Sequence, residues 1–393
     1  MLKISRNWIG LVASFKRKVD RLNKKIEPGE IMKRKGNIYP LIIEKENIKR
    51  AILNAAKGKK DRKSVKNIVD NIEESTLEIQ EMLKNKTYKP SPYIEMKIHD
   101  GTRKKERIIY KPRFYPDQCI HWAIMQQIEP LLMRGMYEFC CASIKGRGIH
   151  YASNYIKKIL VRDRKNTKYC LKLDVKKFYP SIDKEILKRK FMRIIKERDT
   201  LELLDLIVDS SQQGLPIGNY TSQWFANFYL QDLDHYIKEQ LKAPYHIRYM
   251  DDMLIFHRNK KELHKIKHKI EEYLNDEHLR IKENWALFKV DDNRPIDFIG
   301  YRFYRNYTTL RKSNFLRIKR RIKKIYKKGK INYIDASCVL SYYGWIKHCN
   351  SNKFNEKYIR PYISLKKCKG VVRNETKNIQ QYKTRKRFRY RKS

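Results

Sequence analysis

Hydrophobic and polar positions change their spacing several times along the chain, and each pattern predicts a different element. Between residues 40 and 85, apolar side chains such as Ile48, Ala51 and Ile52 recur every three or four positions, so we expect helices there. Further helices are predicted over residues 117–134, 149–162, 183–197, 221–241 and 260–275, and the segment 312–365 is expected to be mostly helical. The letters SIDKE are a start signal for the helix over 183–197.

Other segments alternate apolar and polar residues or carry turn signals between apolar runs. Tyr169, Leu171 and Leu173 alternate in YCLKLDV and predict a strand. The segment IEMKIHDGTRKKERIIYKP predicts a β-hairpin around Asp100 and Gly101, and HIRYMDDMLIFH predicts a strand, a turn and a second strand. A further strand is expected from about residue 296, in IDFIGYRF.

Two adjacent acids interrupt the apolar run HIRYMDDMLIF. Burying Asp251 and Asp252 there is costly, because two like charges lose water together. Asp174 ends a strand 77 positions before Asp251, and the three carboxylates converge if the strands are neighbours in one sheet. Clustered carboxylates repel one another unless cations lie between them, and such oxygen ligands suit Mg²⁺. The competing interpretation is an ordinary polar turn, which the apolar, β-prone flanks disfavour.

The charge of the whole chain bears on the meaning of these acids. Its 393 residues include 91 Lys and Arg against 43 Asp and Glu, a net charge of +48. This excess runs along the entire length and indicates a long polyanion contacted at many phosphates. A membrane surface is a weaker interpretation, because no long amphipathic basic helix dominates. Carboxylates in a chain so basic predict two-metal phosphoryl transfer on nucleic acid.

Cysteine usage and hydropathy limit the cellular setting. No apolar run approaches the ~20 residues needed to span a bilayer, and the short N-terminal WIGLVASF is not expected to be a signal peptide. The seven cysteines are scattered and form no CxxC pair. We therefore expect reduced thiols in a cytoplasmic protein, with no disulfide framework and no zinc site.

Four segments, in order, resemble motifs of reverse transcriptases. RYMDDMLIF resembles the YxDD motif, LKLDVKKFYPSID the motif with the first catalytic Asp, QGLPIGNYTSQWFANF the nucleotide-pocket motif, and IDFIGYRFY the primer grip. The resemblance covers about residues 37–365 and implies an α+β fold, the right-hand polymerase with fingers, an antiparallel palm sheet and a helical thumb. The implied boundaries are a basic leader over 1–36, fingers with the start of the palm over 37–165, palm over 166–305, thumb over 306–365, and a basic tail over 366–393 that stays mobile without a partner.

The resemblance also implies catalytic roles. Asp174, Asp251, Asp252 and the backbone carbonyl of Val175 would hold two Mg²⁺ ions, which lower the pKa of the primer 3′-hydroxyl and stabilise charge on the α-phosphate. Lys282 would correspond to the lysine that protonates the pyrophosphate leaving group. This segment departs from the family pattern, so Lys289 competes for that role.

Further positions match residues that bind the incoming dNTP. Tyr179 would lie under the sugar and exclude a 2′-hydroxyl, the alternative being a packed core tyrosine, whereas Phe178 is expected in the core. Arg107, assisted by Lys105, would reach the triphosphate from the fingers, the alternative being solvated charges on a hairpin. Gly218 would let the backbone approach the nucleotide closely.

The nucleotide-pocket motif also suggests a subtype. Ile217-Gly218 and Ser222-Gln223 stand where most prokaryotic reverse transcriptases have Gln-Gly and Ser-Pro. This form resembles the reverse transcriptases of diversity-generating retroelements, which copy a template-repeat RNA with errors chiefly at adenines and work with a small basic accessory protein, the accessory variability determinant. The implied partners are that protein, template RNA and the RNA/DNA duplex, with no membrane, in a prokaryotic or phage-encoded setting. We hypothesise that an apolar Ile217 loosens geometric checking of the base pair.

Three alternatives stay open. The nearest is another prokaryotic reverse transcriptase, of a group II-like or defence-associated kind. A palm-type polymerase that copies DNA fits the pocket motif less well. The alternative from a different class is a non-catalytic RNA-binding scaffold, and retention of Asp174, Asp251 and Asp252 argues against it.

Overall fold

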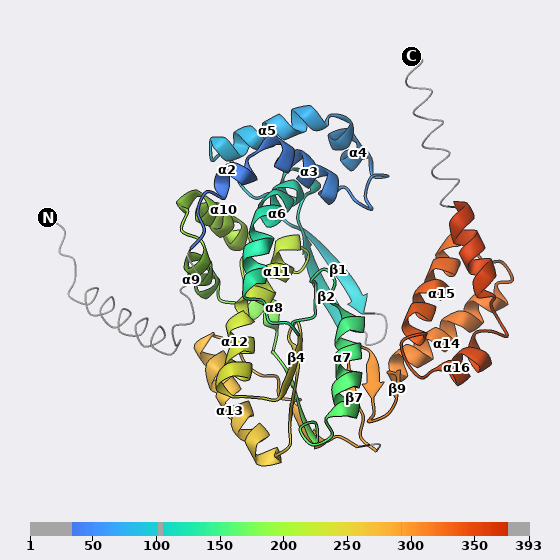
Figure 1. The fold of residues 1–393 in the computed structure, drawn as a ribbon. Coiled ribbons are helices and arrows are strands. Elements are labelled where there is room, and N and C mark those ends of the chain that lie inside the picture. The colour runs from blue at the N-terminus through green and yellow to red at the C-terminus, as the bar shows by residue number, and fades with distance from the viewer. Residues whose placement is uncertain (1–33, 101–104, 292, 376–393) are drawn as a thin grey trace.

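The computed structural model describes residues 34–100, 105–291 and 293–375 (Figure 1). Its N-terminal part is helical, as expected from the spacing of apolar residues. The helices are α2 (Tyr39–Ile42), α3 (Lys45–Ala55), α4 (Lys63–Asp70) and α5 (Ile72–Lys84). Helices α2 and α3 pack on α6 (Cys119–Arg134), which follows the π-helical turn η1 (Phe114–Gln118), while α5 packs on α3 and α4 on α5. Between them, β1 (Ile94–Asp100) and β2 (Lys105–Lys111) form the predicted antiparallel hairpin, whose turn lies outside the described residues.

The central sheet has four strands in the order β4-β5-β3-β6, and every neighbouring pair is antiparallel. These strands are β3 (Tyr169–Asp174), β4 (Tyr245–Tyr249), β5 (Asp252–His257) and β6 (Ala286–Lys289). The two predicted strand segments, β3 and the β4–β5 unit, are therefore direct neighbours. This confirms the condition under which the three acids converge.

Each face of this sheet packs on its own core because side chains alternate along a strand. Leu171, Leu173 and Met253 point into one core, which includes the N-terminal helices and the helices of residues 184–276. Cys170 and Phe256 point into a second core, shared with the C-terminal strands and helices. The helices on the first side are α8 (Phe178–Ser181), α9 (Lys184–Ile194), α10 (Arg198–Asp209), α11 (Tyr220–Tyr229) and α13 (Lys260–Asp276).

A second, three-stranded sheet leads to a helical unit that stands beside the central sheet (Figure 1). Its strands are β7 (Ile296–Phe298), β8 (Tyr301–Phe303) and β9 (Thr308–Leu310), and the helices are α14 (Lys312–Lys327), α15 (Tyr333–Ile346) and α16 (Asn352–Tyr358). The helix α7 (Ile149–Arg162) packs against the same second core. This α+β arrangement with antiparallel sheets is the one expected of a right-hand polymerase.

Several sequence expectations need correction. The single strand expected from residue 296 is a hairpin, because Ile299 and Gly300 both have positive φ (42° and 86°) and reverse the chain in two residues. The helix expected over 221–241 is divided into α11, α12 (Gln231–His235) and the π-helical turn η2 (Tyr236–Gln240). Part of the tail expected to be mobile is ordered, since residues 365–375 are helical and Cys368 is fully buried.

Other expectations are confirmed. Helix α9 begins after Asp183, whose side chain accepts a hydrogen bond from the Ile186 N–H at 3.0 Å, as the start signal predicted. Phe178 is 2% exposed and belongs to the core. All seven cysteines are free. Within the described segments, no helix is both long and apolar enough to cross a membrane.

Candidate active site

The three predicted acids meet where β3 and β5 lie side by side. Asp174 at the end of β3 is paired in register with Asp252 at the start of β5. Asp251 lies in the turn just before β5, and its carbonyl accepts a hydrogen bond from the Val175 N–H at 3.3 Å. By strand alternation, Asp174 and Asp252 both point to the face of the sheet that carries Phe256 and the second core. The strand register therefore brings together two carboxylates that lie 78 positions apart in the chain.

The carboxylates are close enough to perturb one another. Burial, followed by repulsion from Asp174 and Asp252, raises the pKa of Asp251 to about 6. Burial also raises the pKa of Asp252, and Asp174 adds to this, while Lys172 and Arg311 oppose it. Like charges held together in a partly buried place are typical of functional sites, because folding alone does not favour them.

Lys282 reaches this group and Lys289 does not. The Lys282 Nζ lies 2.8 Å from Asp174 Oδ2, and its backbone N–H donates to the Asp174 carbonyl, also at 2.8 Å. Lys289 is paired with Tyr169 at the opposite end of β3. At ~3.3 Å per residue, this places the Lys289 backbone roughly 16 Å along the strand from Asp174. Of the two lysines weighed from the sequence, only Lys282 lies beside the acids.

The donor set fits a hard cation. Asp174 Oδ2 accepts from Lys282, but Asp174 Oδ1 is buried and has no hydrogen-bond partner in the described part of the chain. An unpaired buried carboxylate oxygen is costly, and a cation would satisfy it. Among the described residues, no three His, Cys, Asp or Glu side chains form a ready-made metal-binding group. Carboxylate oxygens such as Asp174 Oδ1 are the ligands that Mg²⁺ prefers.

Tyr179 lies directly beside the turn that carries Asp251. Its hydroxyl is 3.7 Å from the Met250 Sδ, and its pKa is raised by burial and then by the Asp251 charge. The backbone of Tyr179 is fixed from the other side, because its carbonyl accepts a hydrogen bond from the Leu215 N–H at 2.9 Å. A Cβ at Gly214 would lie 2.2 Å from the same carbonyl, so only glycine allows this approach.

The loop around Ile217 and Gly218 is joined to the β1–β2 hairpin. The Tyr110 N–H donates to the Ile217 carbonyl at 2.9 Å, and a Cβ added to Gly218 would lie 2.4 Å from the Tyr110 carbonyl. Gly218 has a φ of 136°, which side chains rarely adopt. Glycine at 218 therefore permits the close contact between this loop and β2.

The other residues predicted to contact the nucleotide are Gln223, Arg107 and Lys105. Gln223 lies on α11 and is exposed. Arg107 and Lys105 belong to β2, paired with Ile98 and Asp100, but their side chains lie outside what the structure describes. Tyr110, on the same strand, contacts the Ile217 loop. Arg107 is three residues away from Tyr110, so its backbone lies roughly 10 Å from that contact.

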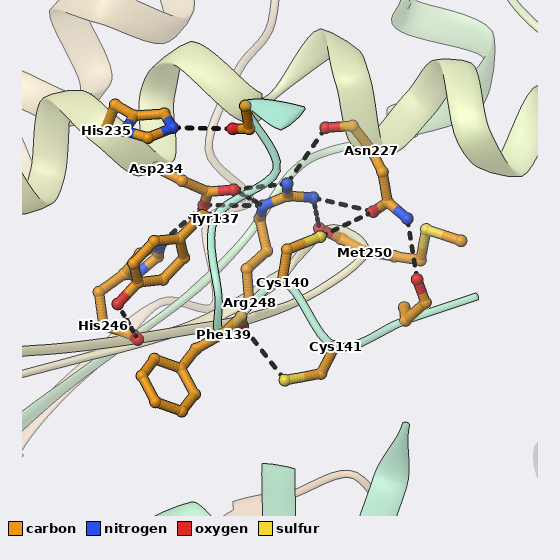
Figure 2. A network of polar contacts seen from close by, with 12 residues as sticks. Tyr137, Phe139, Cys140, Cys141, Asn227, Asp234, His235, His246, Arg248 and Met250 are labelled. Carbon is orange, nitrogen blue, oxygen red and sulfur yellow. Dashed lines mark hydrogen bonds and ion pairs between the residues drawn. The ribbon is translucent and has the colours of Figure 1, made fainter. Parts of the chain in front are cut away.

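Behind the acids lies a fully buried polar network that the sequence interpretation missed (Figure 2). The Arg248 guanidinium donates to Asp234 through Nε and Nη2 at distances of 2.6 to 2.9 Å. Its Nη1 donates to Asn227 Oδ1 at 3.1 Å and to the Met250 carbonyl at 3.2 Å. His246 Nε2 is 2.7 Å from Asp234 Oδ1. Burial alone would raise the pKa of Asp234, but Arg248 and His246 lower it.

This network holds the turn that precedes Asp251. Met250 has a φ of 57°, a left-handed conformation that is unfavourable for a side chain of its size. Arg248 also anchors the open edge of β4, because its N–H donates to the Phe139 carbonyl and its carbonyl accepts from Cys141. The guanidinium thus ties the Met250 carbonyl to Asn227 on α11 and Asp234 on α12 (Figure 2). An arginine inside the apolar run HIRYMDD was the available sequence signal.

Two comparisons of sequence agree with this geometry. A family model described as "Reverse transcriptase (RNA-dependent DNA polymerase)" matches residues 100–303, more than half of the chain. The Retron Ec73 reverse transcriptase of Escherichia coli is 29% identical over 162 residues, which are 38% of this chain and 48% of that protein. The chain therefore spans about half the length of this curated relative.

Solved structures of telomerases are also similar. Apo telomerase from Candida tropicalis has 14% sequence identity and a TM-score of 0.44, over 64% of this chain and 56% of that one. Telomerase from Candida albicans, in complex with a TWJ fragment of telomeric RNA, has 12% identity and a TM-score of 0.44, over 62% and 52%. By the family model that covers residues 100–303, the chain belongs to the reverse transcriptase family.

Proposed function

We propose that this protein is an RNA-directed DNA polymerase that copies template RNA into cDNA by two-metal nucleotidyl transfer. The observation that carries the proposal is the register of β3 and β5, which pairs Asp174 with Asp252 and leaves Asp251 in the adjoining turn. Family membership supports the reaction class. The proposed partners are template RNA and the RNA/DNA duplex, and the proposed setting is the cytoplasm.

Each residue of the site has a proposed role in nucleotidyl transfer. Asp174, Asp251 and Asp252 would hold two Mg²⁺ ions, with the Val175 carbonyl as a further ligand. Bound there, the ions would lower the pKa of the primer 3′-hydroxyl and neutralise charge on the α-phosphate. Lys282 is proposed to donate a proton to the departing pyrophosphate. Its contact with Asp174 Oδ2 holds the ammonium beside the acids until substrate arrives.

The dNTP is proposed to lie between the hairpin β1–β2 and the acids. The Tyr110–Ile217 hydrogen bond supports this placement, because it fixes the pocket loop against the strand that carries Arg107 and Lys105. Both basic residues would bind the triphosphate. Gly218 and Gln223 would line the nucleotide side of the pocket.

Tyr179 is proposed to exclude ribonucleotides. Its backbone is fixed by the hydrogen bond from Leu215, and its hydroxyl contacts Met250 beside Asp251, which supports a fixed position for the ring. Tyr179→Ala should raise the efficiency of ribonucleotide incorporation relative to deoxyribonucleotide by about 10²-fold, while Tyr179→Phe should not. Single-nucleotide incorporation kinetics measure this ratio, and an unchanged ratio in Tyr179→Ala would assign the residue to the core alone.

We further propose that copying is error-prone and belongs to a diversity-generating retroelement, with a small basic accessory protein. The support for this subtype is the resemblance at Ile217 and Gln223. The likeness to a retron enzyme favours the second candidate, another prokaryotic reverse transcriptase without that role. Primer extension on RNA with Mg²⁺, followed by cDNA sequencing and with Asp251→Asn in parallel, tests both levels. Errors concentrated at template adenines support the diversifier, and accurate, acid-dependent cDNA supports the second candidate.

Ile217→Gln tests the source of the errors. Glutamine can hydrogen-bond near the base pair where isoleucine cannot, so misincorporation opposite adenine should fall, by about tenfold for roughly 1.4 kcal/mol of added discrimination. Ile217→Leu keeps the apolar character and serves as the control. Equal error rates in the wild type and Ile217→Gln would contradict the hypothesis.

A further inference from the structure

A cavity of about 320 Å³ lies away from the acids, between α7, the β8–β9 turn and the residues that follow α15. Lys157 and Val161 line it from α7, Tyr304 and Tyr307 from the turn, and Lys347 and His348 from the end of the helical unit. We call it the junction pocket. Its volume is within the range of small-ligand sites, on the order of 300–1,000 Å³.

The junction pocket gathers several basic groups. Lys157 Nζ donates to the His348 carbonyl, and the His348 ring stacks on His150 with ring centroids 3.7 Å apart. Lys347 is exposed, and the described residues of the lining include no Asp or Glu. Many other lysines of the described segments are paired with carboxylates, such as Lys188 and Lys190. A concave site lined by Lys157, Lys347 and His348 fits an anion.

The environment of these groups supports that interpretation. Burial lowers the pKa of Lys157, and burial together with the neighbouring positive groups lowers the pKa of both His150 and His348. The positive charges of Lys157 and Lys347 thus disfavour the charged forms of His150 and His348. An anion bound between Lys157 and Lys347, which both line the pocket, would offset this repulsion.

Aromatic rings adjoin the basic groups. Tyr304 and Tyr307 stack with ring centroids 4.3 Å apart and an angle of 12°, and Tyr307 is 42% exposed. A positively charged groove beside exposed aromatic faces is the combination that binds single-stranded nucleic acid, since phosphates contact the cations and bases stack on the rings. The pocket contains both halves of such a site.

Its position separates it from the copying centre. The strand β8 runs from the Ile299–Gly300 turn to the Tyr304–Tyr307 turn. Arg311, which influences Asp252, donates its N–H to the Gly300 carbonyl, so the acids are nearer that end. The other end, roughly 10 Å further along the strand, carries the pocket.

We infer that the junction pocket is a second nucleic-acid site, which binds one nucleotide of a single strand by its phosphate on Lys157 and Lys347 and its base on Tyr307. Binding there joins α7 to the helical unit. The site needs no catalysis, so it stands or falls independently of the proposed polymerase function. RNA and DNA single strands share this chemistry.

The test is fluorescence anisotropy with labelled single-stranded RNA, and with DNA of the same sequence, over a range of salt concentrations. Lys157→Gln/Lys347→Gln should weaken binding about tenfold near 0.1 M salt and reduce the slope of log affinity against log salt by about 0.7, because the site holds one phosphate. Tyr307→Ala should weaken it about tenfold again, whereas Tyr307→Phe should not. If these variants lose affinity for RNA but not for DNA, the ligand is RNA. If they lose affinity equally for both, the site binds either kind of single strand.

The control is Lys260→Gln/Lys261→Gln, which removes two exposed lysines from α13, a helix that packs in the other core (Figure 1). An equal loss of affinity in this control would overturn the proposal, and so would unchanged affinity in Lys157→Gln/Lys347→Gln. If that variant melts early, photocrosslinking of 4-thiouridine RNA to the wild type decides. Crosslinks at residues 304–307 support the site. Crosslinks found only at other residues refute it.

Discussion

Asp251→Asn is expected to reduce primer extension on RNA by at least about 10³-fold while it stabilises the folded protein. The activity falls because an amide cannot replace a charged carboxylate as a ligand for Mg²⁺ at the reacting phosphate. The stability rises because Asp251 is a partly buried charge beside Asp174 and Asp252, and its pKa is raised to about 6. The same substitution thus removes a catalytic group and a source of repulsion.

The gain in stability should depend on pH. The carboxyl of Asp251 keeps its proton up to about pH 6 in the native state but only to about pH 3.8 when unfolded. Between these values the native state binds more protons, so the wild type loses stability as pH rises. Above pH 6, Asp251→Asn should therefore unfold with a free energy about 1–3 kcal/mol higher in metal-free buffer, and below pH 4 the difference should vanish.

Urea unfolding in EDTA at several pH values checks this, and the matched control is Asp205→Asn. Asp205 on α10 also has a pKa raised by burial, but it lies outside the site, so its substitution should leave primer extension intact. Mg²⁺ should stabilise the wild type more than Asp251→Asn. A variant that is less stable than the wild type at pH 7 without metal would contradict the repulsion among the three acids.

Arg248→Met is expected to cause the largest loss of stability, about 3–5 kcal/mol, because it leaves the Asp234 carboxylate buried without its guanidinium. Both side chains are fully buried and no water can replace the lost contacts. Primer extension should fall as well, since the Met250 carbonyl loses its donor and the turn before Asp251 is no longer fixed. Chemical unfolding and the Mg²⁺ dependence of primer extension measure the two effects.

A second variant separates positioning from stability. Arg248→Met/Asp234→Leu removes both charges, and replacing a buried ion pair with apolar groups is often nearly neutral for stability. It should recover most of the unfolding free energy but not the activity, and its half-saturating Mg²⁺ concentration should stay raised. His246→Leu, which removes a hydrogen bond to Asp234 and the stacking on Tyr137 but leaves Arg248 in place, should retain wild-type Mg²⁺ dependence. Full recovery of activity in the double variant would reduce Arg248 to a structural role.

The acids could be predicted from the sequence because local patterns encode them. Alternation set β3, the apolar flanks set β4 and β5, and the strand ends then determine which carboxylates can meet. The helix starting after Asp183 was predictable for the same reason, since its cap lies within three residues. Lys282 could be placed only by the structure, because its contact with Asp174 spans 108 positions.

The features that were missed depend on contacts between distant segments. Arg248 finds its partners on α11 and α12 and in the segment around Phe139, and no spacing in the sequence relates these parts. The hairpin at Gly300 was read as one strand because IDFIGYRF is continuously β-prone. The close approach of Trp345, 2.4 Å from a Cβ built at residue 300, requires glycine there, and only the tertiary structure reveals it.

We propose that Asp174, Asp251 and Asp252 catalyse template-dependent DNA synthesis on RNA. The most direct test is single-turnover incorporation of one dNTP into a primer annealed to RNA, with the template base varied and with Asp251→Asn in parallel. With Mg²⁺, the wild type is expected to add only the nucleotide complementary to the template, and Asp251→Asn is expected to add none. Tight RNA binding without incorporation under these conditions, or equal incorporation by Asp251→Asn, would contradict it.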